Sequence, residues 1–223
     1  MSTDRATLRP EPRPTLTRPR VLEAAVDLAD RDGLDALSMR KLGQDLGIEA
    51  MSLYTHVRNK DDLLDGMVDA IVREIPVAPA GADWKASLRQ TVMAARTVIL
   101  RHPWAPPVIA TRTEPGPVML GYLDAVMGML RDGGFSIGVT HHALHILGSR
   151  ILGFTQDLYD DSPNLDPAAA AALVEQIGGR FPHVVEMALA VTHEGGLGGC
   201  DDDVEVAISL DLILDGLERL RDA

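Results

Sequence analysis

The chain contains a single cysteine, Cys200, among its 223 residues. One cysteine excludes an intramolecular disulfide framework and is typical of a protein that works in a reducing compartment. No apolar run approaches the length that spans a bilayer, and the Arg- and Pro-rich start lacks the apolar core of a signal peptide. We therefore expect a cytoplasmic protein without a membrane segment.

Aromatic residues make up only 4% of the chain, and β-branched residues are also sparse, whereas Ala and Leu are abundant. This composition favours helices over strands and predicts an all-α fold. The sequence also lacks a Walker-type phosphate loop, a pair of cysteines and a His-Glu-x-x-His zinc motif. These absences argue against an enzyme and against a bound cofactor or metal ion.

Basic side chains are fewer than acidic ones, and the two kinds are distributed unevenly along the chain. The net charge is -12, and residues 1–60 hold ten basic and nine acidic side chains, so the whole excess of negative charge lies in residues 61–223. Averaged over the chain, this is not the balance of a nucleic-acid binder. Repulsion of the acidic part by DNA would favour docking through the near-neutral first quarter. The alternative is that the acidic residues only keep the protein soluble, and this is compatible with a role in orienting the protein on DNA.

Residues 37–60 predict two short helices around a tight turn. Ser38 can cap the first helix, and Gly47 can end it in a left-handed conformation. Leu53 and Val57, four residues apart, bury one face of the second helix. The opposite face then carries small and hydrogen-bonding side chains between cations, a pattern that suits the major groove of DNA. The same spacing also occurs in plain helical bundles.

The rest of the chain divides at proline- and glycine-rich stretches. Residues 1–16 predict a disordered arm, 17–75 a three-helix DNA-binding domain with its fourth helix, and 84–223 a larger helical domain. In the first helix, only Arg18 and Arg20 at its beginning can face DNA. The last helix, residues 202–221, is apolar on nearly all sides, which indicates burial against a second copy of the chain. A central core helix of one monomer is the alternative.

The stretch GLDALSMRKLGQDLGIEAMSLYTHVRNKDDLLDGM resembles the DNA-binding region of the tetracycline-repressor (TetR) family. Several features at matching spacing carry the resemblance: Leu37, Arg40, Leu42, Gly47-Ile48, Leu53-Tyr54, His56-Val57, Asn59-Lys60 and Leu63-Leu64. The later pattern resembles the regulatory domain of the tetracycline-repressor class: His102-Pro103, Thr111-Arg112, residues 133–136, Leu147-Gly148, Gly153 and the closing LDLILDGLERL.

The resemblance implies a sequence-specific transcriptional regulator, a repressor that a small-molecule effector releases from its operator. An activator of the same fold is the alternative. It also implies a homodimer, paired through the helices near 137–159 and 202–221, on a palindromic double-stranded operator. The residues that match the DNA contacts of the family are Arg40, Ala50, Met51, Ser52, Tyr54, Thr55, His56 and Lys60.

An effector pocket is expected in the larger domain. The apolar candidates Met93, Trp104, Met127 and Phe154 would form an adaptable lining. The resemblance adds Arg112, His141, His145 and Asp157. Ile109 stands near the position where the tetracycline repressor uses a His for the magnesium of its drug, so a magnesium–tetracycline ligand is not expected.

His141 and His145 also share one helix face, as metal-binding His pairs do. A metal or small-molecule enzyme built on this pair is a further alternative, although no neighbouring residues complete a ligand set.

Overall fold

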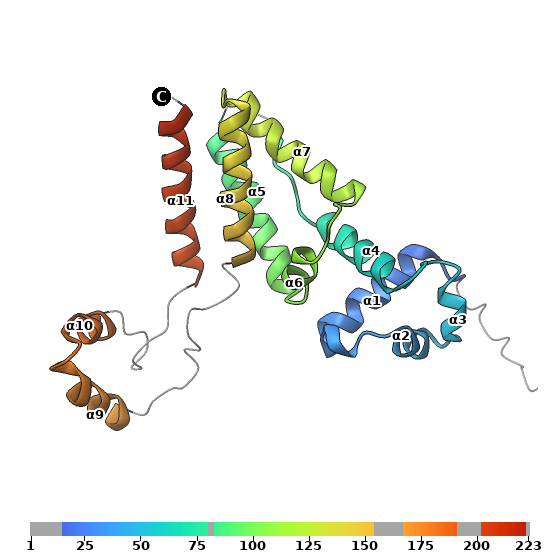
Figure 1. Ribbon diagram of the computed structural model, residues 1–223, viewed down its shortest axis with the longest axis horizontal. Coiled ribbons are helices and arrows are strands. Elements are labelled where there is room, and N and C mark those ends of the chain that lie inside the picture. The colour runs from blue at the N-terminus through green and yellow to red at the C-terminus, as the bar shows by residue number, and fades with distance from the viewer. Residues whose placement is uncertain (1–14, 80–82, 154–166, 191–201, 222–223) are drawn as a thin grey trace, which may run out of the picture. The chain divides into compact units, whose positions relative to one another are not determined.

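The computed structural model describes residues 15–79, 83–153, 167–190 and 202–221 (Figure 1). These residues form eleven α-helices and one short 3-10 helix and contain no strand, which confirms the predicted all-α fold. The chain separates into two compact units. The first unit runs to Glu74 and also contains residues 101–120, and the second contains residues 75–100 and 121–223.

Six short helical elements build the first unit: α1 (Arg18–Asp32), η1 (Leu34–Ala36), α2 (Met39–Leu46), α3 (Ala50–Leu53), α4 (Lys60–Val72) and α6 (Ala105–Ala110). α1 packs along α4, α2 packs against α3, and α6 packs against α4. The core of this unit consists of apolar side chains with almost no exposed surface: Val21, Leu28, Leu37, Leu42, Leu53, Leu63, Met67 and Ile71.

Local sequence sets the ends of these helices. Thr17, Ser38 and Asn59 each cap a helix, because their side-chain oxygens accept a hydrogen bond from a backbone N–H of the first turn. Gly33 and Gly47 end α1 and α2 with positive φ angles of 82° and 67°, conformations that glycine adopts without strain. The predicted capping residues are therefore confirmed.

Residues 101–120 belong to the first unit, although they lie within the range predicted as the larger domain (84–223). Polar contacts explain the difference. His102 and Trp104 both bond to Asp30 of α1, and Arg112 pairs with two carboxylates near the start of α4. None of these contacts has a signature in the local sequence.

The second unit contains the remaining helices: α5 (Trp84–Arg101), α7 (Pro117–Asp132), α8 (Ile137–Gly153), α9 (Pro167–Gly178), α10 (Pro182–Ala190) and α11 (Asp202–Arg221). The last residue of α5 and the first turn of α7 are shared with the first unit. One buried cluster joins four of these helices: Trp84, Leu88, Val92, Val126, Leu130, Phe135, Ala143, Leu147, Leu210, Leu214 and Leu217. Phe135, between α7 and α8, meets the edge of Trp84 at a centroid distance of 4.6 Å.

α11 has two different sides, which refines the expectation of a helix buried all round. Val206, Leu210 and Leu214 are buried, whereas the side chains at 204, 208, 212 and 220 are half or more exposed. Within the chain, α11 therefore buries one face and leaves an apolar face open.

The remaining difference concerns the end of one element. α4 ends at Val72, three residues before the predicted end of the first domain at residue 75. The predicted arm (1–16, apart from its last two residues), the end of the helix predicted to reach residue 159, and the residues Phe154, Asp157 and Cys200 lie outside the described residues. None of the helices in the described ranges is long and apolar enough to cross a membrane.

Candidate nucleic-acid interface

The turn between α2 and α3 is built for close approach of the two helices. Ser38 Oγ accepts from the N–H of Lys41 at 3.2 Å, which starts α2. A Cβ atom at Gly43 would lie 3.0 Å from the carbonyl oxygen of Ile48 and 3.2 Å from the Cα of Ala50. Gly43 therefore lets the backbone of α3 pass close to α2, as a helix-turn-helix requires.

α3 is a single turn, and the burial of its apolar side chain Leu53 determines which side of it faces outward. Leu53 and Val57 are almost fully buried, as expected, but the helix ends at Leu53, so Val57 lies beyond it and not on its face. Met51 is 74% and Tyr54 is 45% exposed. Ser52 and Thr55 are exposed as well, whereas Ala50 and His56 are half-buried. Six of the eight predicted DNA contacts thus lie in one short segment, four of them on its exposed face.

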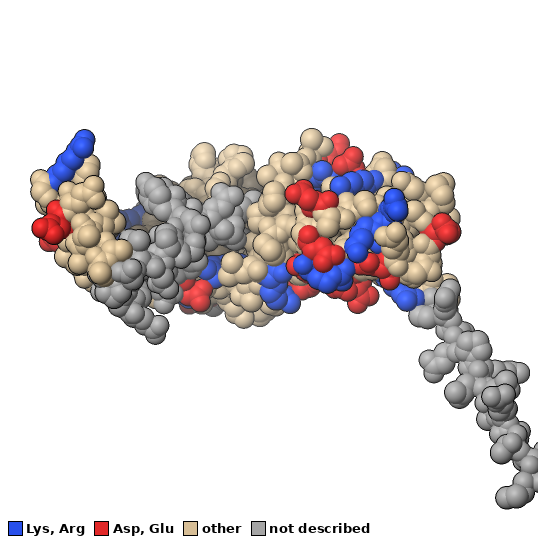
Figure 2. Space-filling view, turned by 90° about the horizontal axis from the view of Figure 1, so that it is seen from below, with Lys and Arg blue, Asp and Glu red and all other residues tan. Residues whose placement is uncertain are grey.

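Free cations flank this face. Arg40 on α2 and Lys60 at the start of α4 are exposed, and no ion pair involves either of them within the described part of the chain. Lys41 instead lies 3.6 Å from Asp45, and Arg58 lies 3.5 Å from Asp62. Acidic and basic side chains are interspersed on the face drawn in Figure 2 rather than gathered into one basic patch. Arg40 and Lys60, on either side of α3, are therefore the cations of this segment that are available for phosphates.

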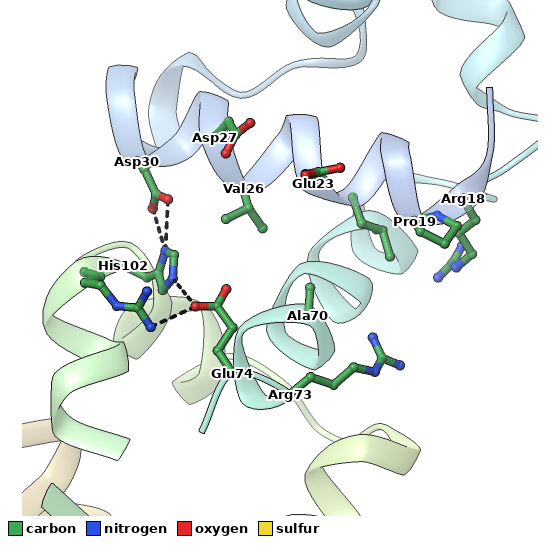
Figure 3. Close-up of a pocket in the computed structure, with 12 residues that line it drawn as sticks. Arg18, Pro19, Glu23, Val26, Asp27, Asp30, Ala70, Arg73, Glu74 and His102 are labelled. Atoms are coloured by element: carbon green, nitrogen blue, oxygen red, sulfur yellow. Dashed lines mark hydrogen bonds and ion pairs between the residues drawn. The ribbon is translucent and has the colours of Figure 1, made fainter. Parts of the chain in front are cut away.

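A polar cleft of about 460 Å³ lies between α1, α4 and the segment that begins at Arg101 (Figure 3). At one end His102 is held between two acids: its Nδ1 lies 2.9 Å from Asp30, and its Nε2 lies 3.6 Å from Glu74. Trp104 Nε1 also donates to Asp30 at 2.6 Å, and Arg101 donates to Glu74 at 2.8 Å. These bonds fasten α1, α4 and the beginning of α6 into one body.

Comparisons with known proteins agree with this geometry. Residues 21–67 match the family model of bacterial regulatory proteins of the tetR family, and residues 76–221 match the model described as the tetracyclin repressor-like C-terminal domain. The second match alone covers more than half of the chain. The chain belongs to the tetracycline-repressor family.

Two relatives and one solved structure illustrate the match. A transcriptional regulator of Saccharopolyspora erythraea is 40% identical over 55% of this chain, and the match spans only 52% of that protein. The transcriptional repressor DrrR1 of Streptomyces coeruleorubidus is 32% identical over 94% of this chain and 80% of its own length. ActR of Streptomyces coelicolor, solved in complex with actinorhodin, is 28% identical with a TM-score of 0.74, over 94% of this chain and all of that one.

As a member of the tetracycline-repressor family, the chain is a helix-turn-helix transcriptional regulator with a ligand-binding domain, and the family is one of regulators rather than enzymes. Residues 134–138 have the G-x-S-x-G spacing of a hydrolase nucleophile. Ser136 Oγ, however, accepts from the N–H of Val139 at 3.2 Å and begins α8 after another helix. The strand-to-helix turn of such a nucleophile is not formed here.

The predicted effector residues that the structure describes are divided between the two units. Trp104 is buried in the first unit, and the Arg112 side chain is largely buried there. In the second unit, Met93 packs on the buried cluster and Met127 is half-buried. Their role in effector binding stays a prediction, as it does for Phe154 and Asp157.

The histidines of α8 lie on its surface. His141, His142 and His145 are exposed, and the rings of His141 and His145 meet edge to face at 4.6 Å. Within the described residues, no group of three or more His, Cys, Asp or Glu side chains is arranged to hold a metal ion.

Sequence reasoning missed two polar networks of the interface. One is the cleft around His102, and the other joins Arg18 of α1 to Asp62 of α4. The sequence places Arg18 among the residues that can face DNA, yet its guanidinium bonds within the chain. Both networks join residues more than forty positions apart, and no local pattern identifies them.

Proposed function

We propose that this regulator is a homodimeric repressor that reads a palindromic operator through α3 and acts in the cytoplasm, where its DNA lies. The observation that carries the proposal is the exposed tip of α3, with Met51 and Tyr54 outermost and free cations on either side. Met51 and the methyl groups of Ala50 and Thr55 suit contact with thymine methyls, and Arg40 suits a guanine edge or a phosphate. Tyr54 and Lys60 suit phosphates.

One exposed apolar face in the second unit supports the dimer. On α11, Val204, Ile208 and Leu212 follow one another at a spacing of four, and Leu220 continues the row two turns later. On α8, which packs directly against α11, Ile146 is exposed as well. A second copy that packs on these two helices would bury the row and form a symmetric four-helix interface. The dyad of such a dimer is what a palindromic operator matches.

Effector control is the second part of the proposal. DrrR1 is a repressor, and ActR was solved with actinorhodin, so we propose that this chain is a repressor released by a small organic molecule bound in the second unit. The release route passes through residues 101–120, which continue from α5 and lead into α7 but pack on α4. Arg112 makes this link electrostatic, because its Nη1 lies 3.3 Å from Asp61 and 3.2 Å from Asp65.

The test begins with selection of bound DNA from a random pool, which should return a palindrome. The protein should sediment as twice its chain mass of 24.0 kDa. With about four phosphate contacts per subunit, the slope of log affinity against log salt should be about -7. A monomer, an asymmetric site or a slope near zero would contradict the proposal.

Matched variants assign the contacts. Lys60→Ala should weaken binding to every sequence alike and reduce the salt slope by about 0.9, whereas Met51→Ala should relax the sequence preference by about 1–3 kcal/mol at one position. Arg73→Ala, which removes an exposed cation at the far end of α4, should change neither. A reporter gene under the selected operator then separates repression from activation, and addition of actinorhodin or of tetracycline with Mg²⁺ tests release.

A further inference from the structure

Arg18, the first residue of α1, bonds to two other elements of the helix-turn-helix. Its Nη1 donates to the carbonyl oxygen of His56 at 2.8 Å and to Asp62 Oδ2 at 3.1 Å. Its Nη2 donates to Asp62 Oδ1 at 3.0 Å and to the Asp62 carbonyl oxygen at 3.4 Å. The guanidinium thus forms a two-pronged pair with one carboxylate and also binds the chain at the end of the reading segment.

Asp62 is held from its other side as well. Its Oδ2 accepts from the backbone N–H of Arg58 at 2.8 Å, and its own N–H donates to the side chain of Asn59 at 2.8 Å. The Asp62 side chain is only 12% exposed. The hydrogen bonds from Arg18 lower the pKa of Asp62 to about 2, so the carboxylate is ionised at any pH at which DNA binding is measured.

These bonds enclose the link between α3 and α4. The pair binds the carbonyl oxygen of His56 and the N–H of Arg58, the residues on either side of Val57. α3 itself is one turn long, and so short a helix has little stability of its own. Buried Leu53 and Val57 and the packing on α2 fix its depth, and the Arg18–Asp62 pair adds a polar restraint where the segment after α3 leads into α4.

The packing of α1 on α4 is shaped to admit the guanidinium. A Cβ atom at Gly66, one turn after Asp62, would lie 2.6 Å from a methyl of Leu22 and 3.2 Å from Arg18 Nη2. Glycine at this position therefore leaves the space that the arginine occupies. Figure 3 shows Arg18 where α1 begins, at the opposite end of the cleft from His102.

We propose that Arg18 and Asp62 are a positioning pair, which sets the orientation of α3 for DNA reading without contacting DNA. The inference rests on the proposed reading of the operator by α3. It replaces the expectation that Arg18 faces DNA, because both terminal nitrogens of its guanidinium already donate within the chain. The bonds given above use Nη1 and Nη2 and not the Nε–H, so a two-pronged phosphate contact would compete with the bonds within the chain.

The experiment is a double-mutant cycle on operator affinity, with Arg18→Gln, Asp62→Asn and both changes together, each confirmed as folded by its unfolding curve. Each single variant should weaken binding to the selected operator by about tenfold, the loss expected for one misplaced base contact. The double variant should be no weaker than the singles, because the two residues act as one unit. The salt slope should stay at its wild-type value.

Two comparisons separate positioning from other roles. Arg18→Lys keeps the charge but loses the two-pronged geometry, so it should bind more weakly than wild type even if Arg18→Gln proves too unstable to measure. The pair Arg31–Asp45, at 2.6 Å on the surface of the same unit, is the matched control. Its cycle of Arg31→Gln and Asp45→Asn should leave operator affinity unchanged.

Distinct results would overturn the proposal. Folded variants of Arg18 and Asp62 that bind the operator as well as wild type, or losses that simply add, would exclude positioning. A salt slope reduced by about 0.9 in Arg18→Gln would make Arg18 a phosphate contact instead. If the wild-type protein binds no operator with a salt-dependent affinity, the proposed function fails together with the pair. If it does and the variants match it, only the pair fails.

Discussion

Leu212 tests the dimer most directly, because it is the most exposed of the apolar side chains along α11, at 68%. Full burial of a leucine side chain contributes about 1.5–3 kcal/mol, so covering the exposed part contributes about 1–2 kcal/mol. A two-fold axis places two copies of Leu212 in the interface. Leu212→Ala should therefore weaken dimerisation by about 2–4 kcal/mol, which raises the dimer dissociation constant roughly 30- to 1,000-fold.

The assay is sedimentation or mass photometry over a dilution series, with operator binding measured at the same protein concentrations. The control is Leu100→Ala on α5, which removes the same atoms from a side chain that is 47% exposed but lies away from the apolar row of α11. The dimer dissociation constant of this variant should equal that of wild type. Unfolding curves exclude loss of the fold. A Leu212→Ala protein that dimerises as tightly as wild type would refute the assignment of this face.

Further expectations concern single contacts. Because Asp62 has a pKa of about 2 when folded, against 3.8 when unperturbed, it stabilises the fold above about pH 4, and this is lost as the pH falls toward 2. The free energy of unfolding of wild type should thus exceed that of Asp62→Asn by about 1–2 kcal/mol at pH 7 in urea titrations, and a gap that persists at pH 2 would contradict it. Phe135→Ala should cost about 3–5 kcal/mol in the same assay, because the ring is buried against Trp84; a loss below 1 kcal/mol would disprove its place in the core. Trp104→Phe keeps the apolar ring but removes the donor to Asp30 and should cost about 1–2 kcal/mol, with no loss expected if that bond is absent in solution.

The parts of the fold that follow from neighbouring residues were predictable. A cap such as Ser38 and a positive-φ residue such as Gly47 act on the turn in which they stand, so a short window of sequence contains the whole cause. The burial of Leu53 and Val57 was predictable in the same way, although the helix predicted to carry both ends at Leu53.

Contacts between distant residues were not predictable in this way. Arg18 and Asp62 are 44 positions apart, and nothing in the sequence distinguishes this arginine from Arg20. The inclusion of residues 101–120 in the first unit depends on His102 and Trp104 meeting one carboxylate of α1. The sequence alone does not distinguish a charged side chain that pairs within the fold from one that remains available for a ligand, because the packing of the helices decides this.

The ion pairs between α5 and α11 explain how the apolar face of α11 is presented. Lys85 pairs with Asp215, Arg89 with Asp211 and Arg96 with Asp203, so the two helices run antiparallel. Three of the carboxylates of α11 are thus paired with basic side chains of α5.

These pairs also fix the rotation of α11 about its own axis. A shift by one residue would turn the helix by about 100°, break all three pairs and bring buried leucines such as Leu210 and Leu214 to the surface. Each chain therefore sets the row from Val204 to Leu220 outward by itself, before any partner binds. In the proposed dimer, a symmetric partner would meet a preformed face, and the spacing of the two α3 segments on DNA would depend on how rigidly each chain holds that face.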